Sequence, residues 1–590
     1  MKTFFKALLG LFLIFGTVNA ATPQLIQQAT NAIDSQLARE YVSAKVTPLP
    51  IINDDQFVRR AYLQIIGRIP TIAEYEQFTR INSPTKRAEL VRYLVNTDGY
   101  VSNLYNYWSE NLRIREKLNN TNFFNGTLYI KYVKDSIANN IPYNAFVKDL
   151  LTSKGDYYDN PSIGVYERDL GMPLDNLIAN MKTFAGIDIS CAQCHDDPFQ
   201  DWSQIQFYKM AAMFYQAEAT GKKNPAAREK IKQIRQETEE IIKNDPKQRG
   251  LNNQVSNFLS ATLASVNVEP NRKLTLPHDY RYTDFPPNSV VSPQVLFGKY
   301  DIKNTEDLRL DAVDWLINTD IFTKNIVNRY WGIIFNQPLI PRIDNIYGNP
   351  TMNESMMVLL SAIYKKLNYN TKDFIQVLCS TQLFQRQSYS GKMPDQYVFI
   401  GPVMKRLSAE QMWDSILSFT VERPDYFHSE YPELYKNVMT VKDFDALKLD
   451  DVRAKLTEMN NINGKKYYGA LTYKGYNLIR ASEVNDLSSV NNILGQLGRG
   501  DRELIGTSSR DGNVSQVISL MNGQLVDIAT KKDSYLLTSI AQKSQADKIE
   551  IIFKSILSRK PTILEKSLFA KSSDEDLIWA LINTNEYKFL

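Results

Sequence analysis

Apolar side chains recur at helical spacing over residues 22–215, with short polar breaks between the runs. One run places five apolar side chains on a single helix face: Phe57, Ala61, Tyr62, Ile65 and Ile66. Gly67 ends that run. Thr71 and Glu74 follow as a capping box, in which the hydroxyl and the carboxylate each accept a hydrogen bond from an unpaired backbone N–H. The pattern predicts a multi-helical N-terminal domain.

A similar layout returns near the other end of the chain, over residues 553–565. There a helix, an arginine, a Pro-Thr pair and a glutamate repeat the order found in residues 62–74. Two occurrences of so common a helix-capping motif do not define a repeat protein. They predict two similar helical corners, one early and one late in the chain.

The middle of the chain changes character twice. Residues 221–245 are rich in Lys, Glu and Gln around a thin apolar stripe, which predicts a solvated helix that forms a hairpin with residues 255–264. Five prolines within residues 268–298 then exclude a continuous helix. We expect a charged helical insertion over residues 221–265 and a Pro-rich extended connection over residues 266–300.

Helical spacing resumes at about Glu306 and continues with a broad apolar stripe over residues 326–335. Ser408 and Gln411 predict another capped helix start. Residues 463–483 are rich in Tyr and Gly with weak alternation, which predicts a hairpin.

The patterns together predict a mainly α protein with a few short strands. A multi-helical N-terminal domain covers residues 21–220, and a larger helical C-terminal domain covers residues 301–590. The length of 590 residues is enough for about three domains with a sizeable core in each.

Composition narrows the class of protein further. The chain is 43% hydrophobic and 23% charged, values that exclude wholesale disorder, a collagen-like fibre and a multi-span membrane protein. The 69 Lys and Arg nearly balance the 65 Asp and Glu, so we expect no nucleic-acid partner. Cys and His number only three each, so their positions are informative.

The first twenty residues have the composition of a secretory leader. Lys2 and Lys6 precede a short apolar run over residues 8–16, and Ala20 is a small residue at the expected cleavage point. An uncleaved N-terminal anchor is the alternative. No later apolar stretch has transmembrane length, and we expect an exported protein, in the periplasm or at the cell surface, without an integral membrane segment after cleavage.

Cys191, Cys194 and His195 form a CxxCH motif, the signature of c-type haem attachment. Two thiols three positions apart can each add to one vinyl group of the haem, and the following residue can supply an imidazole nitrogen to the iron. Covalent attachment agrees with export, because bacterial c-type haem is fitted outside the cytoplasmic membrane. We predict one covalent haem c, with His195 as the proximal ligand.

Three other interpretations of the motif remain open: a redox disulfide, half of a zinc site, or a structural disulfide. The sixth ligand of the iron is also open. The candidates are His278, His428, Met210 and Met213, although Met at helical spacing is more often a core residue than a ligand.

Side chains around the motif have ordinary structural interpretations. Asp201 is expected as a helix N-cap, and Pro198-Phe199 as a turn with a buried ring. The alternative is that Phe199 and Trp202 pack on a porphyrin. Cys379, in an apolar helical context, is expected to be a buried, unpaired thiol.

Several phrases together resemble two known families. Residues 55–71, 140–146 and 191–202 resemble the planctomycete-type cytochrome-c-like domain, PSCyt of the second type. Its usual companion, PSD of the first type, is similar to four later phrases: Val327–Trp331, Pro341–Asp344, Arg406–Trp413 and Ser515–Asn522. Both families have unknown function, so the resemblance implies the architecture and export rather than an activity. The family usually reads Cys-His-Asp-His-Pro-Phe, whereas Asp197 replaces the second His here.

Three functions follow as hypotheses. The first is a monohaem protein that passes electrons to a redox partner in the periplasm or at the cell surface. The second is a secreted enzyme that acts on an extracellular substrate such as a polysaccharide. The third is a binding or assembly module in which the CxxC is a disulfide. Carboxylates such as Asp344 and Glu410 are available for catalysis, but salt bridges with Arg342 or Arg406 are the favoured expectation.

Overall fold

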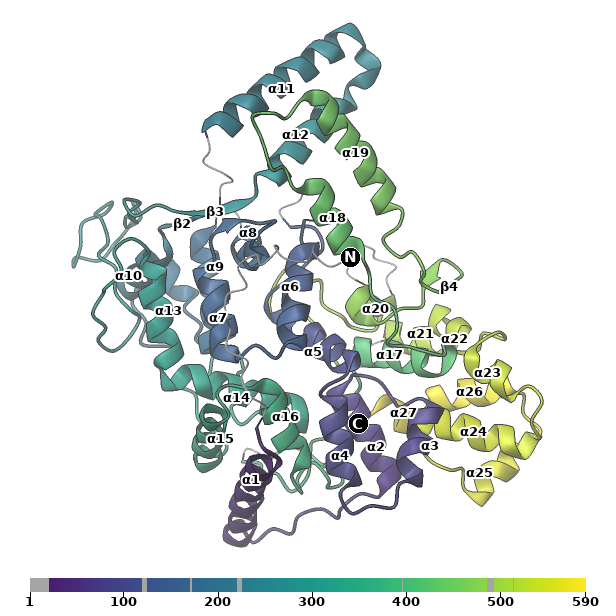
Figure 1. The fold of residues 1–590 in the computed structure, drawn as a ribbon. Coiled ribbons are helices and arrows are strands. Elements are labelled where there is room, and N and C mark those ends of the chain that lie inside the picture. The colour runs from purple at the N-terminus through teal and green to yellow at the C-terminus, as the bar shows by residue number, and fades with distance from the viewer. Residues whose placement is uncertain are drawn as a thin grey trace, which may run out of the picture.

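The computed structural model describes residues 21–118, 125–169, 172–219, 225–394, 396–484, 493–512 and 514–590. The expected leader, residues 1–20, lies outside these ranges. Within them the protein is mainly α-helical with a few short strands, so the predicted fold class is confirmed (Figure 1).

The first ten helices precede the charged insertion. They are α1 (Pro23–Ala44), α2 (Asp54–Ile65), α3 (Ile72–Arg80), α4 (Lys86–Leu94), α5 (Asp98–Asn111), α6 (Thr127–Ala138), α7 (Tyr143–Thr152), α8 (Gly164–Glu167), α9 (Pro173–Asn180) and α10 (Gln204–Phe214). As predicted, the α2 helix ends just before Gly67, which has a φ of 77°. The predicted capping box at Thr71 and Glu74 begins α3.

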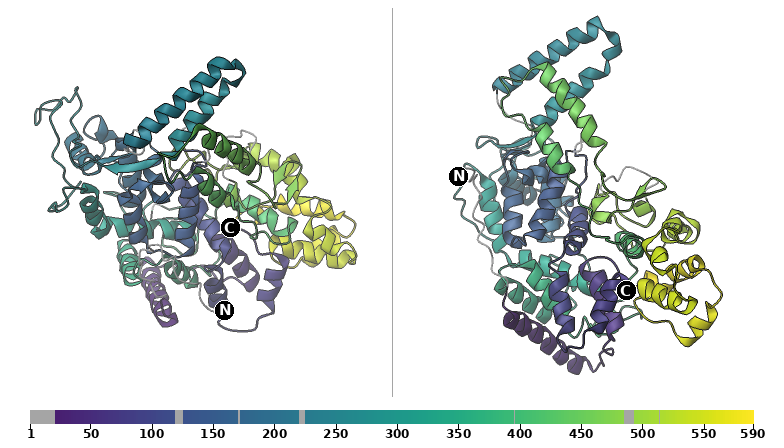
Figure 2. Two further views of the ribbon diagram at one scale, coloured as in Figure 1. Left: turned by 45° about the horizontal axis from the view of Figure 1, so that its top comes forward. Right: turned by 45° about the vertical axis from the view of Figure 1, so that its right-hand side comes forward.

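The charged segment forms the expected helical hairpin. Its arms are α11 (Pro225–Asn244) and α12 (Gly250–Thr262), which pack against each other. Both arms contact α19 (Leu449–Asn463), and α12 also contacts α18 (Tyr431–Met439). This group of helices projects from the rest of the molecule in Figures 1 and 2.

The later part of the chain is also helical. Its remaining helices are α13 (Leu308–Asn318), α14 (Asp320–Phe335), α15 (Glu354–Lys366), α16 (Thr371–Ser380), α17 (Ala409–Thr420), α20 (Ile493–Gln496), α21 (Val514–Asn522), α22 (Gln524–Ala529), α23 (Tyr535–Ile540), α24 (Gln545–Leu557), α25 (Ile563–Leu568), α26 (Asp574–Ile582) and α27 (Asn585–Lys588). The predicted capping box at Ser408 and Gln411 begins α17.

Two small sheets accompany the helices. In one sheet β3 (Ser265–Val268) lies between β1 (Gly155–Asp156) and β2 (Ala217–Glu218), and both pairings are antiparallel. The other sheet is the predicted hairpin of β4 (Thr472–Tyr473) and β5 (Tyr476–Asn477). Residues 269–307 form no helix, as their prolines require.

Two hydrophobic cores hold the described residues together. The first extends from Ile26 to Ile462 in sequence, and the second joins Leu63 and Ile69 to buried residues between Leu407 and Tyr587. The cores therefore interleave segments from both ends of the chain, and the domain boundaries expected from composition stay a prediction.

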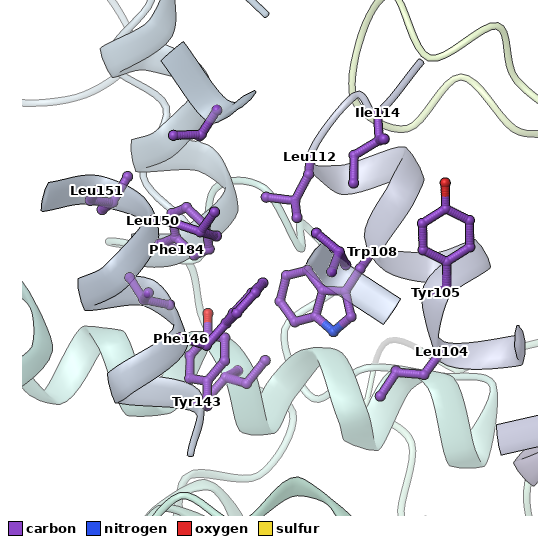
Figure 3. Packing of buried hydrophobic residues seen from close by; sticks show 14 of the residues in the cluster. Leu104, Tyr105, Trp108, Leu112, Ile114, Tyr143, Phe146, Leu150, Leu151 and Phe184 are labelled. Carbon is purple, nitrogen blue, oxygen red and sulfur yellow. The ribbon is translucent and has the colours of Figure 1, made fainter. Parts of the chain in front are cut away.

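Aromatic packing dominates part of the first core. Figure 3 shows the Trp108 ring of α5 facing Tyr143 and Phe146 of α7. The ring centroid of Trp108 lies 5.8 Å from that of Tyr143 and 6.1 Å from that of Phe146. These contacts fix α5 against α7.

Among the helices of the described ranges, none combines the length and the apolar character needed to cross a bilayer.

Candidate functional site

The CxxCH motif follows a tightly anchored stretch of backbone. A wide helical turn, Met181–Ala185, ends at Gly186, whose φ is 61°. A Cβ at position 186 would lie 2.8 Å from Oδ1 of Asn325 and 2.9 Å from the Ile346 side chain, so only glycine fits. Ile187 and Ile189 are fully buried. The chain therefore enters the motif at a fixed position on the first core.

Asp188 organises the turn that leads into the motif. Its Oδ1 accepts hydrogen bonds from the backbone N–H of Ser190 at 3.0 Å and from the Ser190 hydroxyl at 2.6 Å. Nζ of Lys182 lies 2.9 Å from its Oδ2. Burial alone would raise the pKa of Asp188, but these donors outweigh burial and hold that pKa below its ordinary value. The charged carboxylate thus stabilises the turn.

The two motif cysteines occupy one short 3-10 turn, Cys191–Gln193, and the residue after it. Both sulfurs are free, with Cys191 partly exposed and Cys194 exposed. Burial, followed by the carboxylates of Asp197 and Asp188, raises the pKa of the Cys191 thiol. Disulfide oxidoreductases instead lower the pKa of their attacking cysteine. The electrostatics therefore favour a neutral thiol over a redox-active thiolate.

His195 is exposed directly after the turn. Its Nδ1 lies 2.7 Å from the backbone oxygen of Asp196. A carbonyl oxygen only accepts, so Nδ1 carries the proton and Nε2 keeps a lone pair for a metal ion. This is the arrangement in which a histidine ring is oriented for ligation through Nε2.

The start of α10 corrects one prediction. Ser203, not Asp201, is the N-cap of α10, and it forms a capping box with Gln206. Asp196 also assists the helix start, because its Oδ1 accepts a hydrogen bond of 2.7 Å from the backbone N–H of Gln204. Asp201 precedes the N-cap by two residues, too early to reach the orphan donors of the first turn.

The prediction of a buried Phe199 ring is also wrong. Phe199 is 87% exposed, whereas Trp202 is only 4% exposed. Oδ1 of Asp197 accepts hydrogen bonds from the backbone N–H groups of Phe199 and Gln200, and this turn directs Phe199 to solvent. The Trp202 ring packs instead against Tyr347, with centroids 4.8 Å apart. An exposed phenyl ring therefore follows the motif, four residues after His195.

Part of the Pro-rich connection lies against the CxxCH motif. The local sequence patterns did not predict this contact. The Tyr282 hydroxyl accepts a hydrogen bond of 2.8 Å from the backbone N–H of Asp196. The pKa of Tyr208 is raised by burial and then by the nearby Cys194 and Asp279, which places these three side chains close together. The connection therefore covers one side of the motif next to α10.

The four candidates for the sixth ligand lie in different surroundings. His278 is exposed on the same connection, four residues before Tyr282. His428 lies elsewhere, with its Nε2 3.5 Å from Oδ2 of Asp98 in α5. Met210 and Met213 are fully buried in the first core. The structure thus brings the segment of His278, and not His428, to the motif.

Three predictions away from the motif have clear outcomes. Cys379 is free and fully buried, as predicted, and burial raises the pKa of its thiol. Asp344 and Glu410 form ion pairs, but the predicted partners are wrong. Asp344 pairs with Arg329 at 3.0 Å, and Glu410 lies 3.7 Å from Arg499. The observed partners, Arg329 and Arg499, lie in other parts of the chain, so the local sequence pattern does not identify them.

Comparisons with known proteins agree with this architecture. Residues 32–219 match the family PSCyt2, described as a protein of unknown function (DUF1549). Residues 308–572 match the family PSD1, also described as a protein of unknown function (DUF1553). No curated protein and no solved structure matches the chain. The chain therefore belongs to the proteins in which a PSCyt2 region is followed by a PSD1 region.

Proposed function

We propose that the protein is an exported monohaem protein of the c type, which transfers electrons or carries out haem-linked redox chemistry in the periplasm or at the cell surface. Cys191 and Cys194 hold the haem through two thioether bonds, and Nε2 of His195 is the proximal ligand of the iron. The observation that carries the proposal is the CxxCH motif on an accessible turn, with two free thiols and an imidazole whose Nε2 has no hydrogen-bond partner among the described residues.

The surroundings support attachment at this turn. Two accessible thiols suit addition to vinyl groups, and Gly186 with the buried Ile187 and Ile189 keeps the turn in place. Nδ1–H of His195 donates to the Asp196 carbonyl, which orients the ring. The exposed Phe199 ring offers apolar surface on the turn that follows the motif. A haem held here would supply one-electron redox chemistry.

His278 is the sixth-ligand candidate that the geometry favours. The Tyr282–Asp196 hydrogen bond ties its segment to the motif, and Asp279 in that segment lies near Tyr208. Met210 and Met213 are fully buried in the first core, where methionine is more often a packing residue than a ligand.

The experiment is expression in a host with cytochrome c maturation, followed by optical spectroscopy and intact-mass measurement. We expect a reduced-state α-band and a mass increase equal to one haem. Both should be lost in the double variant Cys191→Ala/Cys194→Ala. The matched control is Cys379→Ala, which removes the third thiol and should keep both signals. His278→Ala should change the spectrum of the bound haem more than His428→Ala does.

An unmodified mass in the wild-type protein, or retention of haem by the double variant, would count against the proposal. A mass lower by two hydrogens would instead support the alternative, a secreted binding module or enzyme in which Cys191 and Cys194 form a disulfide. One observation favours that alternative over a zinc site. The described residues contain no group of three or more His, Cys, Asp and Glu side chains placed to hold a metal ion.

A further inference from the structure

A second site-like feature lies apart from the motif. A cleft of about 910 Å³ opens between α2, α5, α14, residues 404–411 and residues 498–512. Lys588 and Phe589 complete its wall. The PSCyt2 region and the PSD1 region therefore both line this cleft.

Paired backbone segments form one wall of the cleft. Residues 405–407 pair antiparallel with residues 588–590, and Arg406 is directly opposite Phe589. The backbone N–H of Leu590 donates to the Lys405 carbonyl at 2.9 Å, and that of Leu407 donates to the Lys588 carbonyl at 2.8 Å. This pairing fixes the backbone that carries Lys405, Arg406 and Lys588, so these cations are positioned before any ligand arrives.

Four cationic side chains line the cleft: Lys405, Arg406, Arg510 and Lys588. Among the described residues, no carboxylate lies within ion-pair distance of any of them. Three of the four carboxylates that line the cleft are engaged elsewhere. Asp344 pairs with Arg329, Glu410 lies near Arg499, and Glu110 accepts a hydrogen bond of 2.9 Å from the backbone N–H of Ser508. The fourth, Asp511, is exposed.

The cations also destabilise one another. Burial lowers the pKa of Lys405, and the neighbouring Arg510 lowers it further. Burial lowers the pKa of Lys588, and the neighbouring Arg406 adds to that effect. Burial likewise lowers the pKa of Arg406, whereas Arg510 is exposed and lies near Glu410 and Glu110. Positive charge that is partly desolvated and unpaired is stabilised when an anion binds beside it.

We propose that this cleft binds an anionic ligand that carries at least two sulfate, phosphate or carboxylate groups. The volume lies near the upper end of the range for small-molecule sites and far exceeds the space of a single inorganic ion. The Arg510 guanidinium can bind an oxyanion through a planar pair of N–H donors, and Arg406, whose Nη1 donates to Oε1 of Gln516, adds positive charge beside it. The two ammonium groups supply point charges on the paired wall.

The test is isothermal titration calorimetry of the full chain at low salt with three probes of different chemistry. They are inositol hexakisphosphate for phosphate, sucrose octasulfate for sulfate and trigalacturonate for carboxylate. We expect at least one probe to bind, with an affinity that falls as salt is added. Lys405→Gln/Lys588→Gln should weaken that binding by about tenfold or more, because two charge-assisted contacts are lost.

The matched control is Lys532→Gln/Lys543→Gln, which removes the same charge from two exposed lysines outside the cleft. It should change the affinity by less than about twofold, because distant exposed charges are screened. If the paired-wall variant fails to fold, as judged by circular dichroism, Arg510→Gln replaces it, because this exposed side chain does not belong to the pairing. Equal losses in the cleft and control variants would overturn the proposal. So would the absence of binding for all three probes at about 1 mM. The tightest probe identifies which oxyanion the cleft prefers.

Discussion

Buried arginines provide hydrogen bonds where helix ends lack them. The guanidinium of Arg59 donates to the carbonyl of Ile556 at 2.9 Å, and also to those of Glu586 and Tyr587. Ile556 lies in the last turn of α24, where backbone carbonyls have no partner within the helix. One side chain from α2 thus satisfies acceptors on two helices about five hundred residues later.

Glu167, in contrast to Arg59, is a buried ionisable side chain that lacks a hydrogen-bond partner for one of its oxygens in the described part of the chain. It is 5% exposed, and its Oε1 has no hydrogen-bond partner among the described residues. Burial raises its pKa from 4.5 to about 8. The folded protein keeps the proton of Glu167 at neutral pH while the unfolded chain releases it, so stability falls as pH rises from about 4.5 to about 8.

Glu167→Gln should remove this dependence. The variant and the wild type should have similar thermal midpoints at pH 5. At pH 8.5 the variant should be more stable by about 2 kcal/mol or more, because each pH unit of a shifted pKa corresponds to about 1.4 kcal/mol. Thermal unfolding at both pH values measures the difference. Glu430→Gln, at an exposed glutamate, is the control. A gap between wild type and Glu167→Gln that is equal at both pH values would refute the assignment.

At the scale of elements, the two helical corners have the same construction. Arg68 pairs with Glu74 at 2.7 Å in the first corner, and Arg559 pairs with Glu565 at 2.7 Å in the second. A capping box begins the second helix of each corner. The corners lie together, since α3 packs against α24. The helix-ending residue has a left-handed backbone in both, with φ of 77° at Gly67 and 54° at Ser558.

The matched exchange of these two residues should have opposite effects. Ser558→Gly should stabilise the protein by up to about 1 kcal/mol, because it relieves a left-handed non-glycine residue and removes a buried hydroxyl that has no partner among the described residues. Gly67→Ser should destabilise it by about 2 kcal/mol or more. A Cβ at position 67 would lie 2.6 Å from Oδ1 of Asn103, whose Nδ2 caps the end of α2 through the Gln64 and Ile65 carbonyls.

Thermal midpoints of the two variants and the wild type give the measurement. If both substitutions lower the midpoint, the backbone at Ser558 is not strained in the way that its φ indicates.

The sequence patterns predicted the local structural features of the fold well. The capping boxes, the charged hairpin and the β4–β5 hairpin depend on residues that are neighbours in the chain. The prediction for Asp201 failed because α10 begins two residues later, at Ser203. The prediction for Phe199 failed because the turn at Asp197 directs its ring to solvent. The CxxCH motif could be recognised in the sequence. The hydrogen bond between Tyr282 and Asp196 could not be predicted, because it joins residues 86 positions apart.

At the scale of the whole molecule, the PSCyt2 and PSD1 regions depend on each other. The α2 helix contributes Phe57 and Val58 to the first core and Leu63 to the second. Arg68, almost fully buried, also pairs with Asp425 at 2.6 Å. The order of two regions was predictable from the family resemblance, whereas the sharing of α2 was not, because it depends on contacts between distant segments.

A fragment of residues 21–300 should therefore not fold alone. It would expose Leu63 and Ile69 and leave the guanidinium of Arg59 without its acceptors. Size-exclusion chromatography and circular dichroism should show aggregation or lost helix for the isolated fragment. Coexpression with residues 301–590 should restore a helical complex. A monomeric fragment with a cooperative thermal transition of its own would contradict the prediction.

The sharing of α2 between the two cores has a consequence for biosynthesis. The acceptors of Arg59 lie at residues 556, 586 and 587, so the ribosome must synthesise the chain past residue 587 before α2 can reach its final surroundings. Contacts of such long sequence separation slow folding and leave apolar surface uncovered in the meantime. The nascent chain must be shielded from aggregation until residues 556–587 emerge.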